Sequence, residues 1–297
     1  MTDDREWLAE RFEADRGRLR AVAYRMLGSL AEAEDAVQEA WLRLARSDAD
    51  VIENLSGWLT TVVGRICLDM LRSRTSRREE SLDAHIPDPI VEPVDASDPE
   101  AAAVLADSVG LAMLVVLDTL SPAERVAFVL HDTFGVPFDA IAAVLDRSTD
   151  ATKMLASRAR SRLRNNSLTP DADPRRQRAV VDAFLAAARE GDFEGLLNVL
   201  APDVLLRADA GDHPLSGLVR GAAAVASRAS MFRRTVGDAV VTPVLVNGLP
   251  GLFSTVEGKP FSLLAFTVVD ERIVAIDALA DRERLASLSS TWSLPAP

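Results

Sequence analysis

Apolar residues recur at three- and four-residue spacing through the first half of the chain, a pattern typical of amphipathic helices. The spacing predicts helices around Leu19–Met26, Val37–Leu44 and Leu55–Met70. After a proline-containing stretch, a second helical part is expected from about Pro99 to Arg164. The chain therefore begins with two all-α parts.

The second helical part carries strong local boundary signals. Ser121 stands three residues before Glu124, the spacing of a helix-capping box. Further on, a short amphipathic helix at residues 138–145, a three-residue break and a longer basic helix reaching about Arg164 follow one another. This succession predicts a helix-turn-helix.

Beyond Pro174 the pattern changes from helical to mixed. Two amphipathic helices are expected at Val180–Arg189 and Phe193–Leu200. Strand-like runs follow at Val204–Arg207, Val240–Val246, Leu252–Val256, Phe261–Val269 and Ile273–Leu279, with turns at Asn247–Gly248 and Glu257–Gly258. The predicted fold class is a multidomain chain: two all-α modules followed by an α+β domain with a mostly antiparallel sheet.

Proline and acidic residues mark the boundaries between these parts. The expected organisation is a helical module, an acidic linker, a helix-turn-helix module, a second linker and an α+β domain, at residues 1–80, 81–100, 101–166, 167–174 and 175–290.

The net charge of −12 hides two local basic clusters. Residues 79–124 hold eleven acidic side chains and no Lys or Arg, so this run alone accounts for nearly the whole net negative charge of the chain. The basic clusters flank it; they are Arg65, Arg72, Arg74, Arg77 and Arg78 on one side and Arg147, Lys153, Arg158, Arg160, Arg162 and Arg164 on the other. An acidic chain can therefore still bind nucleic acid locally.

Composition excludes several classes of protein. The single cysteine, Cys67, can form neither an intrachain disulfide nor a cluster of thiolate metal ligands. The longest apolar stretch, Leu111–Leu117, is far shorter than a membrane span, and because the first thirteen residues are polar we expect no signal peptide. We expect a cytoplasmic protein without cofactor, metal or membrane contact.

The helix that includes Leu55–Met70 carries a candidate single-strand surface. Trp58, Arg65 and Arg72 are seven residues apart and share one face, with Thr61 beside them. Bases stack on aromatic rings while arginines hold phosphates. The alternative is that Trp58 belongs to the core and the arginines are solvated.

The basic helix after the break carries a candidate duplex surface. Lys153, Ser157 and Arg160 share a face, with Met154 and Arg158 next to it. Presented by a helix-turn-helix, such a face fits the major groove. The alternative is a packing helix with a charged exterior.

Three motifs resemble the sigma-70 family of bacterial RNA polymerase sigma factors, in its extracytoplasmic-function (ECF) type. Residues 35–41 resemble conserved region 2.2, residues 58–74 resemble regions 2.3 and 2.4, and residues 120–125 with the helix-turn-helix resemble region 4. The resemblance covers about Glu6 to Arg164. It implies a sigma factor that binds RNA polymerase core, at its β′ clamp and β flap, and promoter DNA.

The resemblance also assigns roles to individual residues. It implies that the core contacts are Asp35, Gln38, Glu39 and Trp41. It implies that the −10 element is opened and read by Trp58, Thr61, Arg65, Arg72, Arg74, Arg77 and Arg78. It implies that the −35 element is read by Lys153, Met154, Ser157, Arg158 and Arg162. Finally, it implies that the acidic linker threads the polymerase cleft. The eleven carboxylates without a cation suggest that the linker mimics nucleic acid there; a solvated spacer is the alternative.

The third part resembles the SnoaL-like, NTF2-type extension found on some ECF factors. Residues 86–90 resemble the proline-containing linker motif that accompanies it, and residues 280–285 loosely match its last motif. The expected regulatory loop carries Asp209, Gly211 and His213. We expect this domain to modulate activity, by packing on the helices or by binding a small molecule.

Two rival functions are weighed against the sigma factor. A ligand-responsive helix-turn-helix repressor would need neither the residue 35–41 surface nor Trp58. A SnoaL-like enzyme would use an acid–base pair drawn from Asp209, Asp212, His213 and Asp277. His131, in the second helical part, is expected to be structural.

Overall fold

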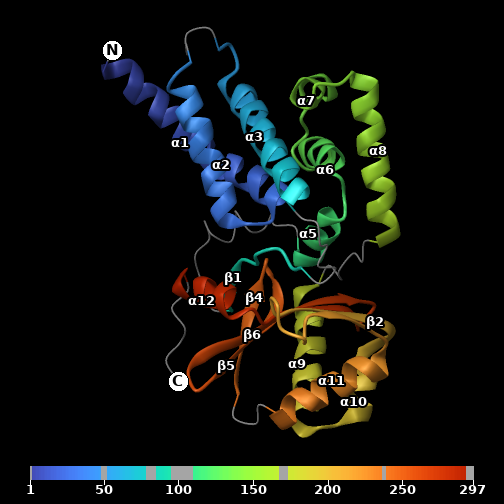
Figure 1. The fold of residues 1–297 in the computed structure, drawn as a ribbon. Helices are drawn as coiled ribbons and strands as arrows, with labels where there is room; N and C mark the ends of the chain where they lie inside the picture. Colours follow the sequence, from blue (N-terminus) through green and yellow to red (C-terminus); the bar gives the residue numbers. More distant parts are fainter. Residues whose placement is uncertain are drawn as a thin grey trace. The chain divides into compact units, whose positions relative to one another are not determined.

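A computed structural model describes residues 2–47, 52–77, 85–94, 110–166, 173–235 and 239–291 (Figure 1). The chain divides into two compact units. The helical unit comprises Met1–Ser81 and Leu114–Ser167, and the sheet unit comprises Leu82–Met113 and Leu168–Pro297. The region predicted to be an acidic linker therefore belongs largely to the sheet unit.

The first half of the helical unit consists of α1 (Thr2–Leu27), α2 (Leu30–Leu44) and α3 (Leu55–Arg77). The apolar positions Leu19, Val22 and Met26 are fully buried, as their helical spacing predicts. Gly28 adopts a φ of 70° between α1 and α2, a conformation that favours glycine. The three predicted helices are confirmed.

The second helical part consists of α5 (Leu111–Asp118), α6 (Pro122–Phe128), a π-helical turn η2 (Val129–Thr133), α7 (Phe138–Leu145) and α8 (Thr149–Asn166). The predicted capping box is present, with the Glu124 carboxylate accepting from the Ser121 amide at 3.1 Å. Helix α7 ends at Leu145, and its C-cap residue Asp146 has a left-handed φ of 53°. Ser148 then accepts a hydrogen bond from the Ala151 amide at 3.2 Å. The predicted helix-turn-helix is confirmed as α7 and α8.

Helix α3 packs against α6 and α7 within the helical unit. A Cβ atom at Gly64 would lie 3.3 Å from Leu130 and 3.4 Å from Val144, so glycine allows this close approach. The buried Arg125 donates to the Met26 carbonyl at 3.0 Å. The two helical parts of the sequence therefore share one core.

The sheet unit contains the helices α9 (Pro174–Glu190), α10 (Phe193–Val199), α11 (Ala222–Thr235) and α12 (Arg282–Thr291). Its strands are β1 (Val91–Pro93), β2 (Leu200–Asp209), β3 (Gly217–Arg220), β4 (Val240–Val246), β5 (Leu249–Val256), β6 (Lys259–Val269) and β7 (Arg272–Leu279). They form one seven-stranded sheet in the order β1-β4-β5-β6-β7-β2-β3. Among the strands that the structure describes, β2 and β7 alone pair in parallel, so the mostly antiparallel α+β prediction is confirmed.

The predicted turns are also found where the sequence places them. Asn247 and Gly248 have φ values of 50° and 78°, and Glu257 and Gly258 have values of 51° and 73°. Two consecutive left-handed residues define the type I′ turn that suits a two-residue hairpin. These turns connect β4 to β5 and β5 to β6.

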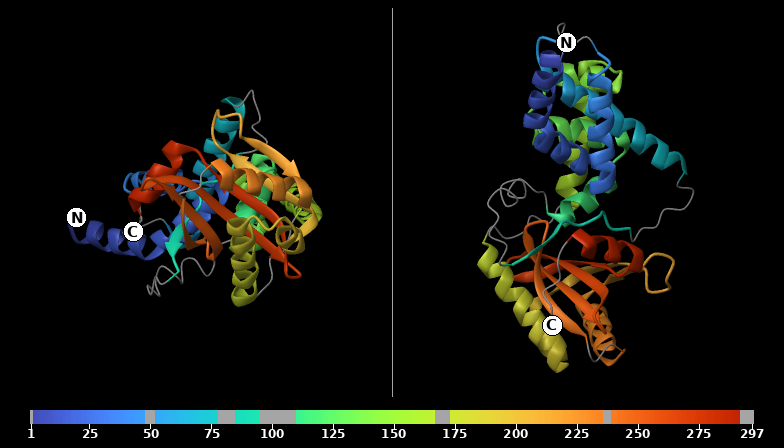
Figure 2. Two further views of the ribbon diagram at one scale, coloured as in Figure 1. Left: turned by 90° about the horizontal axis from the view of Figure 1, so that it is seen from below. Right: turned by 90° about the vertical axis from the view of Figure 1, so that its left-hand side faces the viewer.

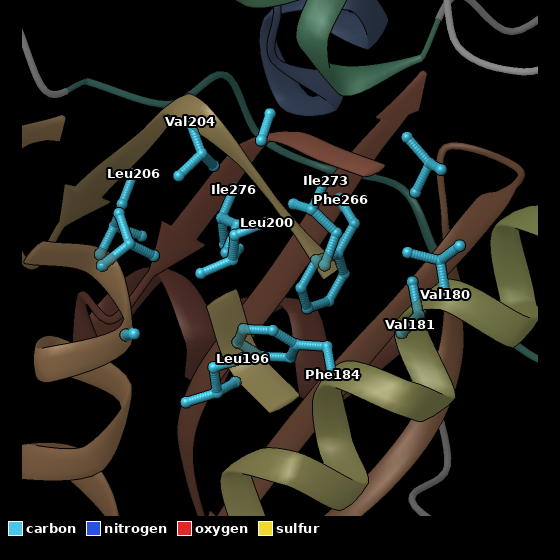
Figure 3. Packing of buried hydrophobic residues seen from close by; sticks show 14 of the residues in the cluster. Val180, Val181, Phe184, Leu196, Leu200, Val204, Leu206, Phe266, Ile273 and Ile276 are labelled. Atoms are coloured by element: carbon cyan, nitrogen blue, oxygen red, sulfur yellow. The ribbon is translucent and has the colours of Figure 1, made fainter. Parts of the chain in front are cut away.

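The two faces of the sheet are covered by different elements. Helices α9 and α12 lie on opposite sides of the sheet (Figure 2). On the α9–α11 side the core is filled by apolar side chains, including Phe184 and Phe266 with ring centroids 5.3 Å apart (Figure 3). Leu206 and Ala208 of β2 belong to this core. Because side chains alternate along a strand, Arg207 points to the opposite face.

Candidate functional site

Helix α2 presents an exposed face that carries three of the four residues expected to bind polymerase. Asp35 and Gln38 are exposed, and the half-buried Glu39 pairs with Arg43 at 2.9 Å. Leu42 follows Gln38 by four residues, lies on the same face and is 41% exposed. The sequence did not indicate that Leu42 is exposed, because a leucine in an amphipathic helix is usually part of the core.

Trp41 is held differently from its three neighbours. Its ring packs against Phe12 of α1 with centroids 5.0 Å apart. Both rings line a cavity of about 420 Å³ between α1 and α2, together with Val37 and Gln38. Gln38 therefore lines this cavity and also belongs to the exposed face of α2.

Helix α3 carries the expected single-strand stripe on one face. Trp58 is half-buried, whereas Arg65 and Arg72 are exposed, and the spacing of seven aligns all three. Thr61 lies beside them and donates to a backbone carbonyl one turn earlier at 3.0 Å. Arg65 donates to the Ala143 carbonyl of α7 at 2.8 Å. One guanidinium of the stripe is thus engaged by the helix-turn-helix.

Arg74 is not brought together with this stripe. It follows Trp58 by sixteen residues, which places it about half a turn away around α3. Its guanidinium donates to the Leu27 carbonyl at 3.0 Å and forms an ion pair with Glu32. Arg77 ends the helix; its side chain, like the whole of Arg78, lies outside the described residues.

Helix α8 presents a continuous exposed face made of Lys153, Met154, Ser157 and Arg158. The buried Ala156 lies on the packed side of the helix. Met154 is 57% exposed, an unusual position for a large apolar side chain. Four of the five residues expected to read duplex DNA therefore lie together and are accessible within the helical unit.

Two other arginines of α8 brace the helix-turn-helix. Arg160 pairs with Asp132 at 2.6 Å, and Arg162 donates to the buried Glu124 carboxylate at 3.0 Å. Arg162 remains 54% exposed and follows Arg158 by one helical turn. It therefore stabilises the capping box while staying at the edge of the exposed face.

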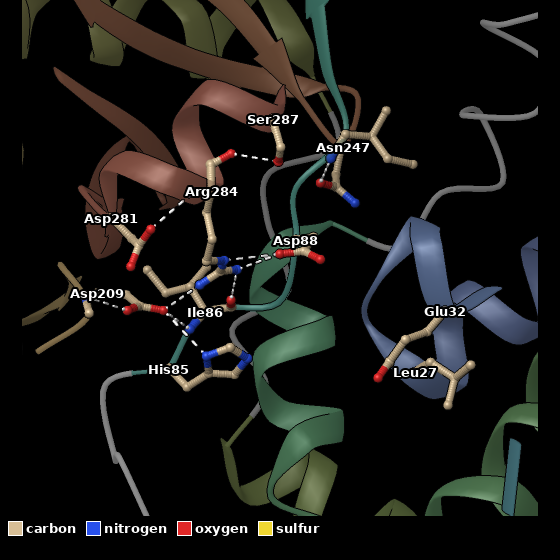
Figure 4. Close-up of polar contacts among 12 residues, drawn as sticks. Leu27, Glu32, His85, Ile86, Asp88, Asp209, Asn247, Asp281, Arg284 and Ser287 are labelled. Atoms are coloured by element: carbon tan, nitrogen blue, oxygen red, sulfur yellow. Dashed lines mark hydrogen bonds and ion pairs between the residues drawn. The ribbon is translucent and has the colours of Figure 1, made fainter. Parts of the chain in front are cut away.

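Asp209 joins the linker to α12 in the sheet unit. Its carboxylate accepts from the Ile86 amide at 2.9 Å and from the Arg284 guanidinium at 2.6 Å, and lies 3.4 Å from His85 (Figure 4). Arg284 also binds the Asp88 carboxylate at 2.7 Å. We call these five residues the Arg284 cluster; it unites the linker motif, the predicted loop and the last motif of the sequence.

The surroundings of Asp209 keep it charged. Burial alone would raise the pKa of this carboxyl group. The hydrogen bonds from His85 and the Ile86 amide, with the positive charge of Arg284, outweigh that effect and lower the pKa of Asp209 to about 2.

The other two residues of the predicted regulatory loop behave differently from each other. Gly211 has a φ of 60°, and a Cβ atom there would lie 2.5 Å from an Asp281 carboxylate oxygen. Asp281 caps α12 by accepting from the Arg284 amide at 2.9 Å, so Gly211 supports the Arg284 cluster. His213 is exposed and accepts from the Leu215 amide at 3.2 Å.

The residues considered for an acid–base pair engage separate partners. Asp277 is buried and binds Arg207 at 2.7 Å; burial raises the pKa of Asp277 and the Arg207 charge opposes this rise. Asp209 belongs to the Arg284 cluster, whereas Asp212 and His213 are exposed.

His131 has a structural environment, as expected. Its Nδ1 lies 3.0 Å from the Val136 carbonyl, and its ring stacks on Phe138 with centroids 3.8 Å apart.

Comparison with protein-family models places the helical parts in a known class. The sigma-70 region 2 model matches residues 11–77, and the sigma-70 region 4 model matches residues 111–163. These ranges contain α2 and α3, and α5 to α7 with most of α8. The helical parts are therefore those of a sigma-70-type factor.

Similar proteins define the family more narrowly. The ECF RNA polymerase sigma factor SigJ of Mycobacterium tuberculosis is 46% identical over 200 residues, covering 67% of this chain and 64% of SigJ. The probable ECF factor SigI of the same organism is 40% identical over 202 residues, covering 67% of this chain and 69% of SigI. The chain belongs to the ECF RNA polymerase sigma factors.

The likeness to a solved structure extends into the sheet unit. The crystal structure of M. tuberculosis SigJ has a TM-score of 0.75 and 36% identity, covering 94% of this chain and 98% of that one. An NTF2-like protein from Burkholderia xenovorans matches 40% of the chain at a TM-score of 0.29 and 25% identity. The predicted combination of helical sigma modules with an α+β extension is confirmed.

Proposed function

We propose that this chain directs RNA polymerase core to promoters with −35 and −10 elements and starts transcription there. The observation that carries the proposal is that three exposed surfaces of the helical unit match the three tasks. They are the α2 face for the polymerase, the α3 stripe for single-stranded DNA and the α8 face for duplex DNA.

The polymerase surface consists of Asp35, Gln38 and Glu39, with Leu42 beside them. The carboxylates supply charge for steering and orientation, and the exposed leucine supplies apolar contact area at the centre of the face. Trp41 packs on Phe12 of α1, so its role is to hold α2 in position.

The −10 surface consists of Trp58, Thr61, Arg65 and Arg72, and we assign Arg77 and Arg78, which follow in the sequence, to the same DNA element. Base stacking on Trp58 is worth roughly 1–3 kcal/mol, which offsets the loss of one base-pair step of about 1.4 kcal/mol. One Arg65 donor is bound to the Ala143 carbonyl, and a phosphate can be bound by the remaining donors of this exposed guanidinium.

The −35 surface consists of Lys153, Met154, Ser157 and Arg158, with Arg162 at its edge. Arg158 and Lys153 can reach guanine edges or phosphates in the major groove, and Met154 offers apolar contact to a thymine methyl group.

Arg74, which was expected to bind the −10 element, is better explained as a brace between α3 and the start of α2.

The sheet unit modulates this activity and performs no catalysis in the proposal. Its interior is filled by side chains such as Phe184 and Phe266, and its buried carboxylates Asp209 and Asp277 are each paired with an arginine. Among the helices that the structure describes, none is long and apolar enough to cross a membrane. We place the protein in the cytoplasm, where polymerase and promoters are found.

Two substitutions separate the DNA surfaces experimentally. Arg158→Ala should weaken binding to a duplex −35 element, with each lost base contact costing roughly 1–3 kcal/mol. Trp58→Ala should leave duplex binding unchanged and reduce strand opening, measured with permanganate on a polymerase–promoter complex. Arg282→Ala removes an exposed positive charge on α12 and serves as the control. Equal loss of duplex binding in both variants would contradict the division of labour.

A further inference from the structure

The exposed face of α8 has a central line of side chains that carries no positive charge. Its members are all exposed and follow one another at four-, three- and four-residue spacing; they are Asp150, Met154, Ser157 and Ser161. We call these four residues the central line. The lysine and arginines of the exposed face lie beside this line, so charge and central position are separated on α8.

The packed side of α8 determines which residues are central. Thr152 and Ala156 are fully buried. Met154 lies two residues from each of them, and two residues correspond to about 200° around a helix. Met154 therefore points away from the packed side, in agreement with its exposed fraction of 57%.

The positive charges of the face lie on both sides of the central line. At about 100° per residue, Lys153 and Arg158 lie roughly 70° from the line in opposite directions. A phosphate backbone borders the major groove on each side, and proteins hold phosphates with lysine and arginine. The two cations are therefore placed to hold the duplex from both sides.

The central line itself is unsuited to phosphate. The Asp150 side chain is 92% exposed, and its carboxylate would be repelled by a phosphate group. Met154 is apolar, and the two serines of the line are neutral. A line without a cation, set between two cations, is suited to the base edges on the floor of the groove.

An apolar side chain in this position can distinguish thymine from the other bases. In the major groove all four bases present hydrogen-bonding groups, whereas thymine also presents a methyl group. The thioether of methionine has no hydrogen-bond donor, and its unbranched chain adapts to apolar surfaces. Met154 therefore gains most from a base that offers a methyl group.

We propose that Met154 is a specificity-determining residue of the −35 surface and selects a thymine by covering its methyl group. This inference rests on the proposed function, in which α8 enters the major groove of the −35 element, and it assigns one base chemistry to one side chain. Removing one methyl-sized group from water corresponds to about a fourfold change in affinity.

Replacement of thymine by uracil tests the methyl contact, because uracil keeps the base pair and lacks only the methyl group. The −35 element is first obtained by selecting bound duplexes from a randomised library with polymerase core and the full chain. Uracil at every thymine of the selected element should weaken binding by the wild-type complex about fourfold. Equal binding of the two duplexes, or a selected element without A·T pairs, would overturn the thymine contact.

Substitutions of Met154 show which side chain makes the contact. Met154→Ser should bind the thymine and uracil duplexes equally, whereas Met154→Leu keeps an apolar side chain and should retain most of the preference. Met231→Ser is the matched control and should keep the wild-type preference, because Met231 is an exposed methionine of α11 in the sheet unit. Since both methionines are exposed, stability should change little in all three variants. A thymine preference that persists in Met154→Ser would overturn the proposal.

The selection also separates this proposal from the proposed function. A shared −35 element that is bound without any preference for thymine over uracil would reject the role of Met154 and leave the sigma function intact. The absence of any shared −35 element among the selected duplexes would reject the proposed function, and the reading by Met154 with it.

Discussion

Replacing Asp209 by Asn should selectively destabilise the sheet unit. The pKa of Asp209 lies near 2 instead of its ordinary value of 3.8, because His85, the Ile86 amide and Arg284 favour its charged form more than burial disfavours it. One pKa unit corresponds to 1.36 kcal/mol, so ionisation contributes roughly 2.4 kcal/mol to folding at neutral pH. Asn still accepts a hydrogen bond, so the expected loss is about 2 kcal/mol.

The stabilisation by the charged Asp209 should depend on pH. A carboxyl group with a lowered pKa in the folded state stabilises the protein fully above its unfolded pKa of about 3.9. That contribution declines as the pH falls toward the folded pKa of about 2. The difference in free energy of unfolding between the wild type and Asp209→Asn should therefore be the same at pH 7 and pH 5, about half as large at pH 3, and small near pH 2.

Urea unfolding read by pulsed hydrogen exchange can follow the sheet unit separately from the helical unit. Asp212→Asn is the matched control, because Asp212 is exposed three residues further along the same loop. A loss below 0.5 kcal/mol for Asp209→Asn, or a gap that stays constant from pH 7 to pH 3, would refute the reasoning about the Arg284 cluster.

Two further predictions concern single positions. Gly211→Ala should destabilise the sheet unit by about 1–3 kcal/mol in the same urea assay, since φ is 60° and the new Cβ would meet Asp281; a cost under 0.5 kcal/mol would show that the loop can adjust. Leu42→Ser should leave stability within about 0.5 kcal/mol, because the side chain is partly exposed, and weaken polymerase core binding at least tenfold in a titration. Leu218→Ser, an exposed leucine of β3, is its control, and equal affinity of both variants would remove Leu42 from the interface.

Features that depend on neighbouring residues could be predicted from the sequence. The capping box at Ser121, the turn at Asn247 and the alternation of strands β4 to β7 all follow from residues within a few positions of one another. The exposed face of α8 also follows from local helical spacing. These predictions needed no knowledge of the rest of the fold.

Features created by distant contacts could not be predicted in the same way. Arg284 and Asp88 are 196 residues apart, and a proline-rich acidic segment usually remains solvated, so nothing local indicated that Val91–Pro93 form a strand or that Asp88 binds Arg284. Strand β3 has four residues, too few for a clear alternating pattern. The alanine-rich start of α11 gave no strong apolar stripe.

The same limit applies to the arginines of α3. Helical spacing correctly aligned Arg65 and Arg72 with Trp58, but the partners of Arg65 and Arg74 are set by packing. Ala143 comes from the helix-turn-helix, and Leu27 and Glu32 come from the junction of α1 and α2. Charge and period alone did not distinguish an exposed arginine, such as Arg65, from one that braces the core, such as Arg74.

The most direct test of the account is transcription of genomic DNA fragments by purified polymerase core, with and without the full chain. The account predicts transcripts that start at discrete sites only when the chain is present, downstream of shared −35 and −10 sequences. Scrambling either element, or introducing Trp58→Ala, should remove most of these starts. Initiation that is equally frequent without the chain, or unaffected by scrambling both elements, would contradict the assignment of this protein as a promoter-directing sigma factor.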